Sequence, residues 1–257
     1  MKLKGQVVFV TGASAGIGEA CAFAFAAEGA KLLLAARRVG RLEAMRPKLM
    51  EAGAEAVHAF GLDVQDRGAV EQAIAGLPDE WRAMDVLVNN AGLSRGLNKL
   101  HEGEVQDWEE MIDTNVKGLL YVTRAVVPGM VERGRGHVIN LGSTAGEITY
   151  PKGAVYCATK AAERSISDGL RQDLLGTSVR VTSVDPGMVE TDFSVVRFRG
   201  DEERAAKVYQ GLTPLKPEDV ADAIVWAATR PAHVNIGRIG MTSIDQANSL
   251  LFNRRAV

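Results

Sequence analysis

The chain has 257 residues, of which 46% are apolar and 5% aromatic, and its formal charge is −2 at pH 7. This length suits one large α/β domain, and the aliphatic composition suits a core around a buried parallel sheet. No block of basic residues and no apolar run of about 18 residues is present, which argues against nucleic-acid binding and a membrane span and predicts a cytoplasmic protein. Two cysteines and four scattered histidines give no metal-ligand spacing, so we expect no metal.

Short β-branched or aliphatic runs alternate with segments whose apolar residues recur at helical spacing. The helical segments include residues 21–27, 42–50 and 70–77. This alternation predicts one domain over residues 1–257, a doubly wound parallel sheet of about seven strands with helices on both faces. The predicted strands are residues 7–10, 31–36, 56–62, 86–88, 137–141, 179–184 and 238–243.

A glycine-rich turn, residues 11–18, joins the first predicted strand to the first helix. Its spacing is Gly-x-x-x-Gly-x-Gly, in which the glycines let the turn close and let a pyrophosphate approach N–H groups at the helix N-terminus. The position between strand and helix predicts a dinucleotide site. The residues expected around the pyrophosphate are Gly12, Ser14, Ala15, Gly16, Ile17 and Gly18.

The second predicted strand ends in two arginines, Arg37 and Arg38, where an acidic residue would bind the adenosine ribose of NAD. Guanidinium groups pair well with the oxygens of a 2′-phosphate. The pattern therefore predicts NADP, with Arg37 as the main contact. The alternative is a solvated loop with no ligand.

Tyr156 and Lys160 lie four residues apart, so both side chains would occupy one face of a helix. Phenols ionise only near pH 10, and a neighbouring ammonium favours the phenolate and makes the phenol usable as a general acid and base. Ser143, thirteen residues before Tyr156, could hold a carbonyl oxygen beside it. Taken alone, Tyr-x-x-x-Lys is also typical of an ordinary helix surface.

Residues 190–215 interrupt the alternation of strands and helices. They follow the sixth predicted strand, and ligands of doubly wound sheets bind beyond the carboxyl ends of the strands. We therefore predict that this segment is a lid over the substrate. The alternative is a surface excursion with no role.

The motifs together resemble those of the short-chain dehydrogenase/reductase family, from one end of the chain to the other. That resemblance implies a single Rossmann-type domain that transfers a hydride between NADP and a substrate CH–OH group. The segments that carry it are 11–18, 62–64, 89–92 and 113–115, with Ser143, Tyr156, Lys160, 186–187 and Thr191.

The resemblance also implies roles for individual residues. The implied catalytic tetrad is Asn115, Ser143, Tyr156 and Lys160, in which Asn115 holds a water that links Lys160 to solvent. Asp63 at a strand end would accept from the adenine amino group, and a helix cap is its alternative role. The further implied cofactor contacts are Asp63, Val64, Asn90, Ala91, Gly92, Tyr156, Lys160, Pro186, Gly187, Val189 and Thr191.

Within the family, the chain is most similar to the NADP-dependent 3-hydroxy acid dehydrogenases, which act on serine and allo-threonine. A 3-hydroxy acid needs a cation for its carboxylate. We expect Arg199 to bind it, with Arg197 and Lys152 as further candidates; the alternative is that the arginines are solvated or paired with nearby acids. The segments that carry this similarity are 111–119, 123–133, 142–146, 194–201 and 231–236.

Two other functions remain open. One is a carbonyl reductase of the same mechanism for an uncharged or larger ketone or aldehyde, since the loop at 187–193 looks shorter than in that subgroup. The other is a non-catalytic protein that senses NADP(H), against which the intact tetrad argues. The resemblance further implies a homotetramer.

Overall fold

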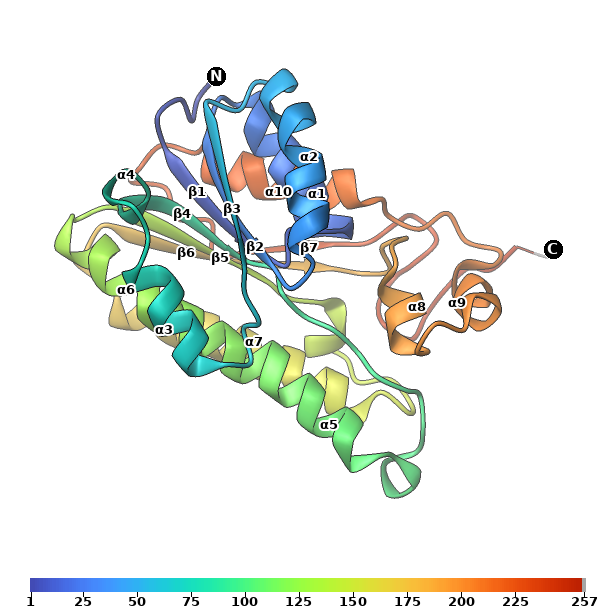
Figure 1. The fold of residues 1–257 in the computed structure, drawn as a ribbon. Coiled ribbons are helices and arrows are strands. Elements are labelled where there is room, and N and C mark those ends of the chain that lie inside the picture. The colour runs from blue at the N-terminus through green and yellow to red at the C-terminus, as the bar shows by residue number, and fades with distance from the viewer. Residues whose placement is uncertain (256–257) are drawn as a thin grey trace.

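The aliphatic runs of the sequence form the strands of one parallel sheet, shown in Figure 1. The computed structural model describes residues 1–255. The strand order is β3-β2-β1-β4-β5-β6-β7, and every neighbouring pair is parallel. The predicted seven-stranded, doubly wound sheet is therefore confirmed. The strands are β1 (Val7–Thr11), β2 (Lys31–Ala36), β3 (Ala56–Gly61), β4 (Met84–Asn89), β5 (Gly136–Leu141), β6 (Val179–Pro186) and β7 (Arg238–Met241).

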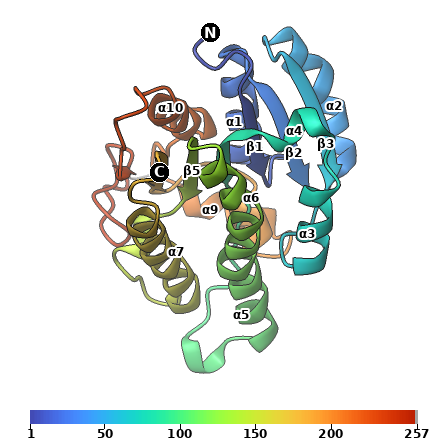
Figure 2. The ribbon, with the colours of Figure 1, turned by 90° about the vertical axis from the view of Figure 1, so that its left-hand side faces the viewer.

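Helices cover both faces of the sheet, as Figures 1 and 2 show: α1, α2 and α10 lie on one face, and α3, α6 and α7 on the other. None of the helices within residues 1–255 combines the length and apolar character needed to cross a membrane. The helices are α1 (Gly16–Ala27), α2 (Val39–Glu51), α3 (Arg67–Ala75), α4 (Asp79–Arg82), α5 (Val105–Ile112), α6 (Leu119–Glu132), α7 (Ala154–Asp173), α8 (Phe193–Arg197), α9 (Glu202–Tyr209) and α10 (Pro217–Ala228).

The central strand β1 is buried on both sides, which explains its unbroken apolar sequence. Successive side chains of a strand point to opposite faces. Val8 accordingly shares a buried cluster with Phe25 of α1, and Phe9 shares the opposite cluster with Met130 of α6. Full burial of one such side chain contributes about 1.5–3 kcal/mol.

The strand order reverses at β1, which pairs with β2 on one side and β4 on the other. The chain leaves the carboxyl ends of β1 and β4 toward opposite faces of the sheet. A crevice therefore opens between the loops that follow these two strands. The glycine-rich turn leads out of β1 at this point, and the ends of β4, β5 and β6 lie along the same edge.

His137 of β5 is a polar residue in the sheet core, with 1% of its surface exposed. Its Nε2 lies 2.7 Å from Thr182 Oγ1 on β6, and its Nδ1 has no hydrogen-bond partner among the described residues. Burial, reinforced by the positive charge of Arg180, lowers the pKa of His137 to about 3. The imidazole is therefore neutral in the folded chain at neutral pH.

We expect this histidine to make the fold sensitive to mild acid. An unfolded histidine binds a proton below about pH 6.5, while folded His137 does not. The contribution of His137 to the free energy of unfolding is therefore fully present above that pH and falls by about 1.4 kcal/mol for each pH unit below it. Urea unfolding at pH 7.5 and 5.0 should show that the wild type loses about 2 kcal/mol more than His137→Gln. The exposed His233→Gln control should follow the wild type. Equal losses in all three proteins would contradict the prediction.

Candidate active site

A cavity of about 560 Å³ lies at the carboxyl edge of the sheet, beside the reversal of strand order. Gly18, Asn115 and Arg197 are absent from its lining, although each contacts a lining residue. Lys152, a candidate for the substrate carboxylate, lines a separate pocket. The remaining residues predicted for the site all line the cavity. They are Gly12, Ser14, Ala15, Gly16, Ile17, Arg37, Arg38, Asp63, Val64, Asn90, Ala91, Gly92, Ser143, Tyr156, Lys160, Pro186, Gly187, Val189, Thr191 and Arg199.

The turn after β1 has room for glycine alone at two points. Gly12 has a φ of +65°, and a Cβ there would lie 2.9 Å from the Cα of Ala91. A Cβ on Gly18 would lie 2.4 Å from the carbonyl oxygen of Gly12. This close packing brings the N-terminus of α1 to the cavity. Ala15 supplies no side-chain cap, so the first N–H groups of α1 are left for a ligand, as a pyrophosphate requires.

Positive charge gathers where β2 ends. The Nε of Arg38 lies 3.3 Å from Ser14 Oγ, and Nη1 of Arg37 lies 4.0 Å from the Asp63 carboxylate. Partial burial and the neighbouring guanidinium of Arg41 lower the pKa of Arg38. An anion placed between Ser14, Arg37 and Arg38 would offset the repulsion between the neighbouring guanidinium groups. The donor set therefore fits the 2′-phosphate of NADP.

Asn115 lies in a π-helical segment, Asp113–Gly118, that interrupts the helix between α5 and α6. Its Oδ1 accepts from the N–H of Leu93, and its Nδ2 donates to the Leu93 carbonyl oxygen and to Thr159 Oγ1, at 2.8–3.0 Å. Asn115 thus joins the loop after β4 to α7. Such π-helical turns are common at functional sites. The water expected at Asn115 stays a prediction.

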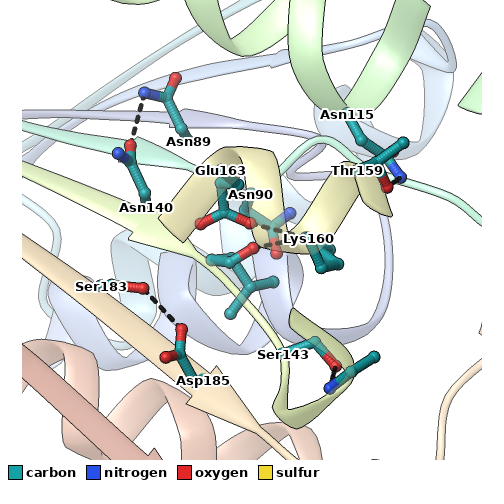
Figure 3. Close-up of polar contacts among 12 residues, drawn as sticks. Asn89, Asn90, Asn115, Asn140, Ser143, Thr159, Lys160, Glu163, Ser183 and Asp185 are labelled. Carbon is teal, nitrogen blue, oxygen red and sulfur yellow. Dashed lines mark hydrogen bonds and ion pairs between the residues drawn. The ribbon is translucent and has the colours of Figure 1, made fainter. Parts of the chain in front are cut away.

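Ser143, in the loop after β5, and Tyr156, on α7, both line the cavity. Ser143 Oγ accepts from the N–H of Ala145 at 3.1 Å, which fixes the hydroxyl at the start of a 3₁₀ turn (Figure 3). The Tyr156 residue is 9% exposed, and its ring centroid lies 5.7 Å from that of Phe193 on α8. A substrate oxygen between the two hydroxyls could be held by Ser143 and exchange a proton with Tyr156.

Lys160 lies one turn after Tyr156 on α7, as its spacing predicts. Its Nζ donates to the Leu141 carbonyl oxygen at 2.6 Å and to Glu163 Oε2 at 3.0 Å, and Figure 3 shows Glu163 beside it. Lys160 is 8% exposed. Burial alone would lower the pKa of its ammonium, but the charge and hydrogen bond of the Glu163 carboxylate, together with the negative charge of ionised Tyr156, outweigh burial and raise it. Lys160 therefore carries a stable positive charge at the site.

The segment 190–215 contributes α8 and α9 and borders the cavity through residues that include Phe193 and Val196. Arg199 has a positive φ of 53° and forms an ion pair with Asp107 of α5. The guanidinium of Arg197 lies 5.5 Å from the ring centroid of Tyr156, and its Nη2 donates to Tyr150 Oη at 3.2 Å. The two arginines thus differ in surroundings, although only two positions separate them.

Three contributors to the site escaped the sequence reasoning. Arg95 donates to both oxygens of Glu110 and to the carbonyl oxygen of Val196, and so ties α8 to α5. Asp107 holds Arg199. Glu163 looks like a solvated partner of a lysine three residues before it, and no local signal announces its burial. Among residues 1–255, no group of three or more His, Cys, Asp or Glu side chains could hold a metal ion.

Comparisons with known proteins agree with this geometry. The family model described as short chain dehydrogenase matches residues 6–202. The chain is 53% identical to the NADP-dependent 3-hydroxy acid dehydrogenase YdfG of Salmonella typhi over 94% of its own length and 96% of the relative's. For the serine 3-dehydrogenase of Rhizobium radiobacter the identity is 43%, over 93% and 94%.

Solved structures give the same result. The closed form of a serine dehydrogenase complexed with NADP⁺ superimposes with a TM-score of 0.91 at 49% identity, covering 98% of this chain and all of that one. The chain belongs to the short-chain dehydrogenase/reductase family.

Proposed function

We propose that this chain is an NADP-dependent oxidoreductase that interconverts a small 3-hydroxy acid, of the serine or allo-threonine type, and the matching semialdehyde. The observation that carries the proposal is the meeting of three features in and beside one cavity: the glycine turn with its arginines, the Ser143–Tyr156–Lys160 group, and the guanidinium of Arg197 against the Tyr156 ring. The names of the relatives support the same substrate class.

The residues of the chain divide the work of the reaction. When bound, NADP supplies the hydride chemistry, as acceptor in one direction and donor in the other. Ser143 would orient the substrate oxygen by its hydroxyl. Tyr156 would take the alcohol proton during oxidation and return it during reduction, while Lys160 favours the phenolate through its charge. Burial of Tyr156 and Lys160 strengthens these interactions because water does not screen them.

The carboxylate of the substrate would bind Arg197 rather than Arg199. Arg199 already has a carboxylate partner in Asp107, whereas no acidic side chain of residues 1–255 forms an ion pair with Arg197. Arg197 contacts Tyr150 instead, and burial raises the pKa of Tyr150, so that hydroxyl stays neutral. The sequence reasoning favoured Arg199, which stays the second candidate, with Lys152 the third.

The segment 190–215 would then serve as the substrate lid. It lies against the cavity through α8, and Arg95 and Asp107 connect it to α5. The predicted homotetramer and the cytoplasmic location also belong to this proposal. Leu120 of α6 and Ile112 of α5 expose 43% and 41% of their surface and could supply an interface, whereas Met111, Leu119 and Val122 are buried in the chain itself.

The first test is a substrate panel. Initial rates of NADP⁺ reduction should be high with L-serine, L-allo-threonine, 3-hydroxypropionate or 3-hydroxyisobutyrate and low with simple secondary alcohols. Tyr156→Phe should lower kcat by about 10²–10⁴-fold, because the proton loses its acceptor. Faster turnover of neutral alcohols would instead support the carbonyl reductase for uncharged substrates. NADP(H) binding with no turnover of any substrate would support the sensor.

Removal of the Arg197 charge should weaken the reaction with hydroxy acids and leave the reaction with neutral alcohols nearly unchanged. Arg197→Met keeps an unbranched aliphatic side chain but removes the guanidinium that would bind the carboxylate, so KM for the hydroxy acid should rise about 10–100-fold. The rate with a neutral alcohol should stay within about twofold of the wild type, since no charge pairs there. Arg199→Met is the matched variant, with a smaller expected rise. A larger effect at Arg199 would return the role to that residue.

Cofactor preference should depend on Arg37. Arg37→Ala should raise KM for NADP⁺ by about 10–100-fold and leave KM for NAD⁺ nearly unchanged, because only NADP⁺ carries the 2′-phosphate. Arg41→Ala serves as control, because Arg41 pairs with Asp192 and does not itself line the cavity. If Arg37→Ala changed KM for NADP⁺ and KM for NAD⁺ equally, the 2′-phosphate would be assigned to Arg38 alone.

A further inference from the structure

Glu163 is a buried carboxylate with no part in the proton transfer described above. It lies one turn after Lys160 on α7 and exposes 1% of its surface. Its Oε2 accepts from Lys160 Nζ at 3.0 Å, while Oε1 has no hydrogen-bond partner among residues 1–255. A buried ion pair with an unsatisfied oxygen stabilises a fold poorly compared with an apolar residue of similar size. A role beyond stability would account for its presence.

The carboxylate limits the directions in which Lys160 can donate. An ammonium has three N–H groups. One is used by the Leu141 carbonyl oxygen at the end of β5 and one by Glu163. The third remains for the cavity, which Lys160 lines. Glu163 and Leu141 thus set the orientation of the ammonium that serves Tyr156.

The charges around this pair are few. Tyr156 faces the pair from α7, and Asp185 faces it from β6. The guanidinium of Arg197 lies over the ring of Tyr156. Asp185 has its own partners, because it accepts from Ser183 Oγ and from Arg238 of β7. Each of Lys160 and Glu163 is therefore the other's only ion-pair partner among residues 1–255. Burial raises the pKa of Glu163, and the Lys160 ammonium offsets this only in part.

We infer that Glu163 is a positioning residue that orients Lys160 and, when ionised, cancels part of the positive charge that Lys160 presents to Tyr156. This inference rests on the proposed role of Tyr156 as acid and base. Lys160 alone would favour the phenolate, the form that alcohol oxidation requires. Paired with Glu163, it favours the phenolate less. The pair thereby keeps Tyr156 in the phenol form, which carbonyl reduction requires, up to higher pH.

The test removes the charge in two ways. Glu163→Gln keeps an oxygen that can accept from Lys160, whereas Glu163→Met has neither charge nor acceptor. Asp168→Asn is the matched control, since it removes one carboxylate from an exposed i,i+3 pair on the same helix. Phenolate formation is followed in the cofactor-free protein by its absorbance near 295 nm. Subtraction of the Tyr156→Phe titration isolates Tyr156 from the other tyrosines.

We expect the Tyr156 titration midpoint to be lower by about one pH unit in both Glu163 variants, and unchanged in Asp168→Asn. The acid limb of kcat/KM for oxidation should move by the same amount. Glu163→Met should also lower kcat about tenfold, because Lys160 loses its orientation. Unchanged midpoints in the folded Glu163 variants would overturn the inference. Full activity of Tyr156→Phe would instead overturn the proposed function on which it rests.

Discussion

The active site depends on the contact between the glycine turn and the end of β4. Thr11 Oγ1 accepts the N–H groups of both Asn90 and Ala91 at 3.1 Å, and Asn90 Nδ2 donates to the carbonyl oxygens of Thr11 and Gly12. Four hydrogen bonds thus join loops that leave neighbouring strands in opposite directions. Any side chain larger than hydrogen at Gly18 would force this contact apart. The contact between the glycine turn and the end of β4 therefore sets the positions of the N-terminus of α1 and of the arginines after β2.

The second constraint is the burial of polar groups along α7. Tyr156, Lys160, Glu163 and Ser167 recur at helical spacing, so they share one face, and that face is turned toward the sheet. Lys160 donates to the carbonyl oxygen at the end of β5, whereas Glu163 pairs with Lys160 on α7 itself. Ser167 meets the amide of Asn140, which in turn accepts from Asn89, as Figure 3 shows in part. The polar network occupies volume that aliphatic side chains would otherwise fill, and it holds the reacting groups in one arrangement.

The sequence predicted the sheet well because buried parallel strands are short apolar runs that local composition identifies. Helix starts were less accurate: α3 begins at Arg67 rather than at residue 70, because its first turn is polar and capped by Asp66, which hydrophobic spacing does not register. Motifs located the cavity lining, since glycine turns and strand ends lie close to their ligands. The burial of Glu163 and the pairings of Arg197 and Arg199 could not be predicted, because each depends on elements far away in the chain. Arg199 meets Asp107 across 92 positions, and only the folded arrangement brings them together.

The described end of the chain returns to the substrate segment. The Arg254 side chain donates to the carbonyl oxygens of Val208 and Gln210. The backbone N–H of Arg255 donates to the carbonyl oxygen of Gly211. The first residues of the chain lie elsewhere, beside α1, where the N–H of Lys2 meets the Glu28 carboxylate. Arg254 and Arg255 therefore help to position α9, which belongs to the segment beside the cavity. Loss of these two side chains would change the placement of that segment without touching the cavity lining.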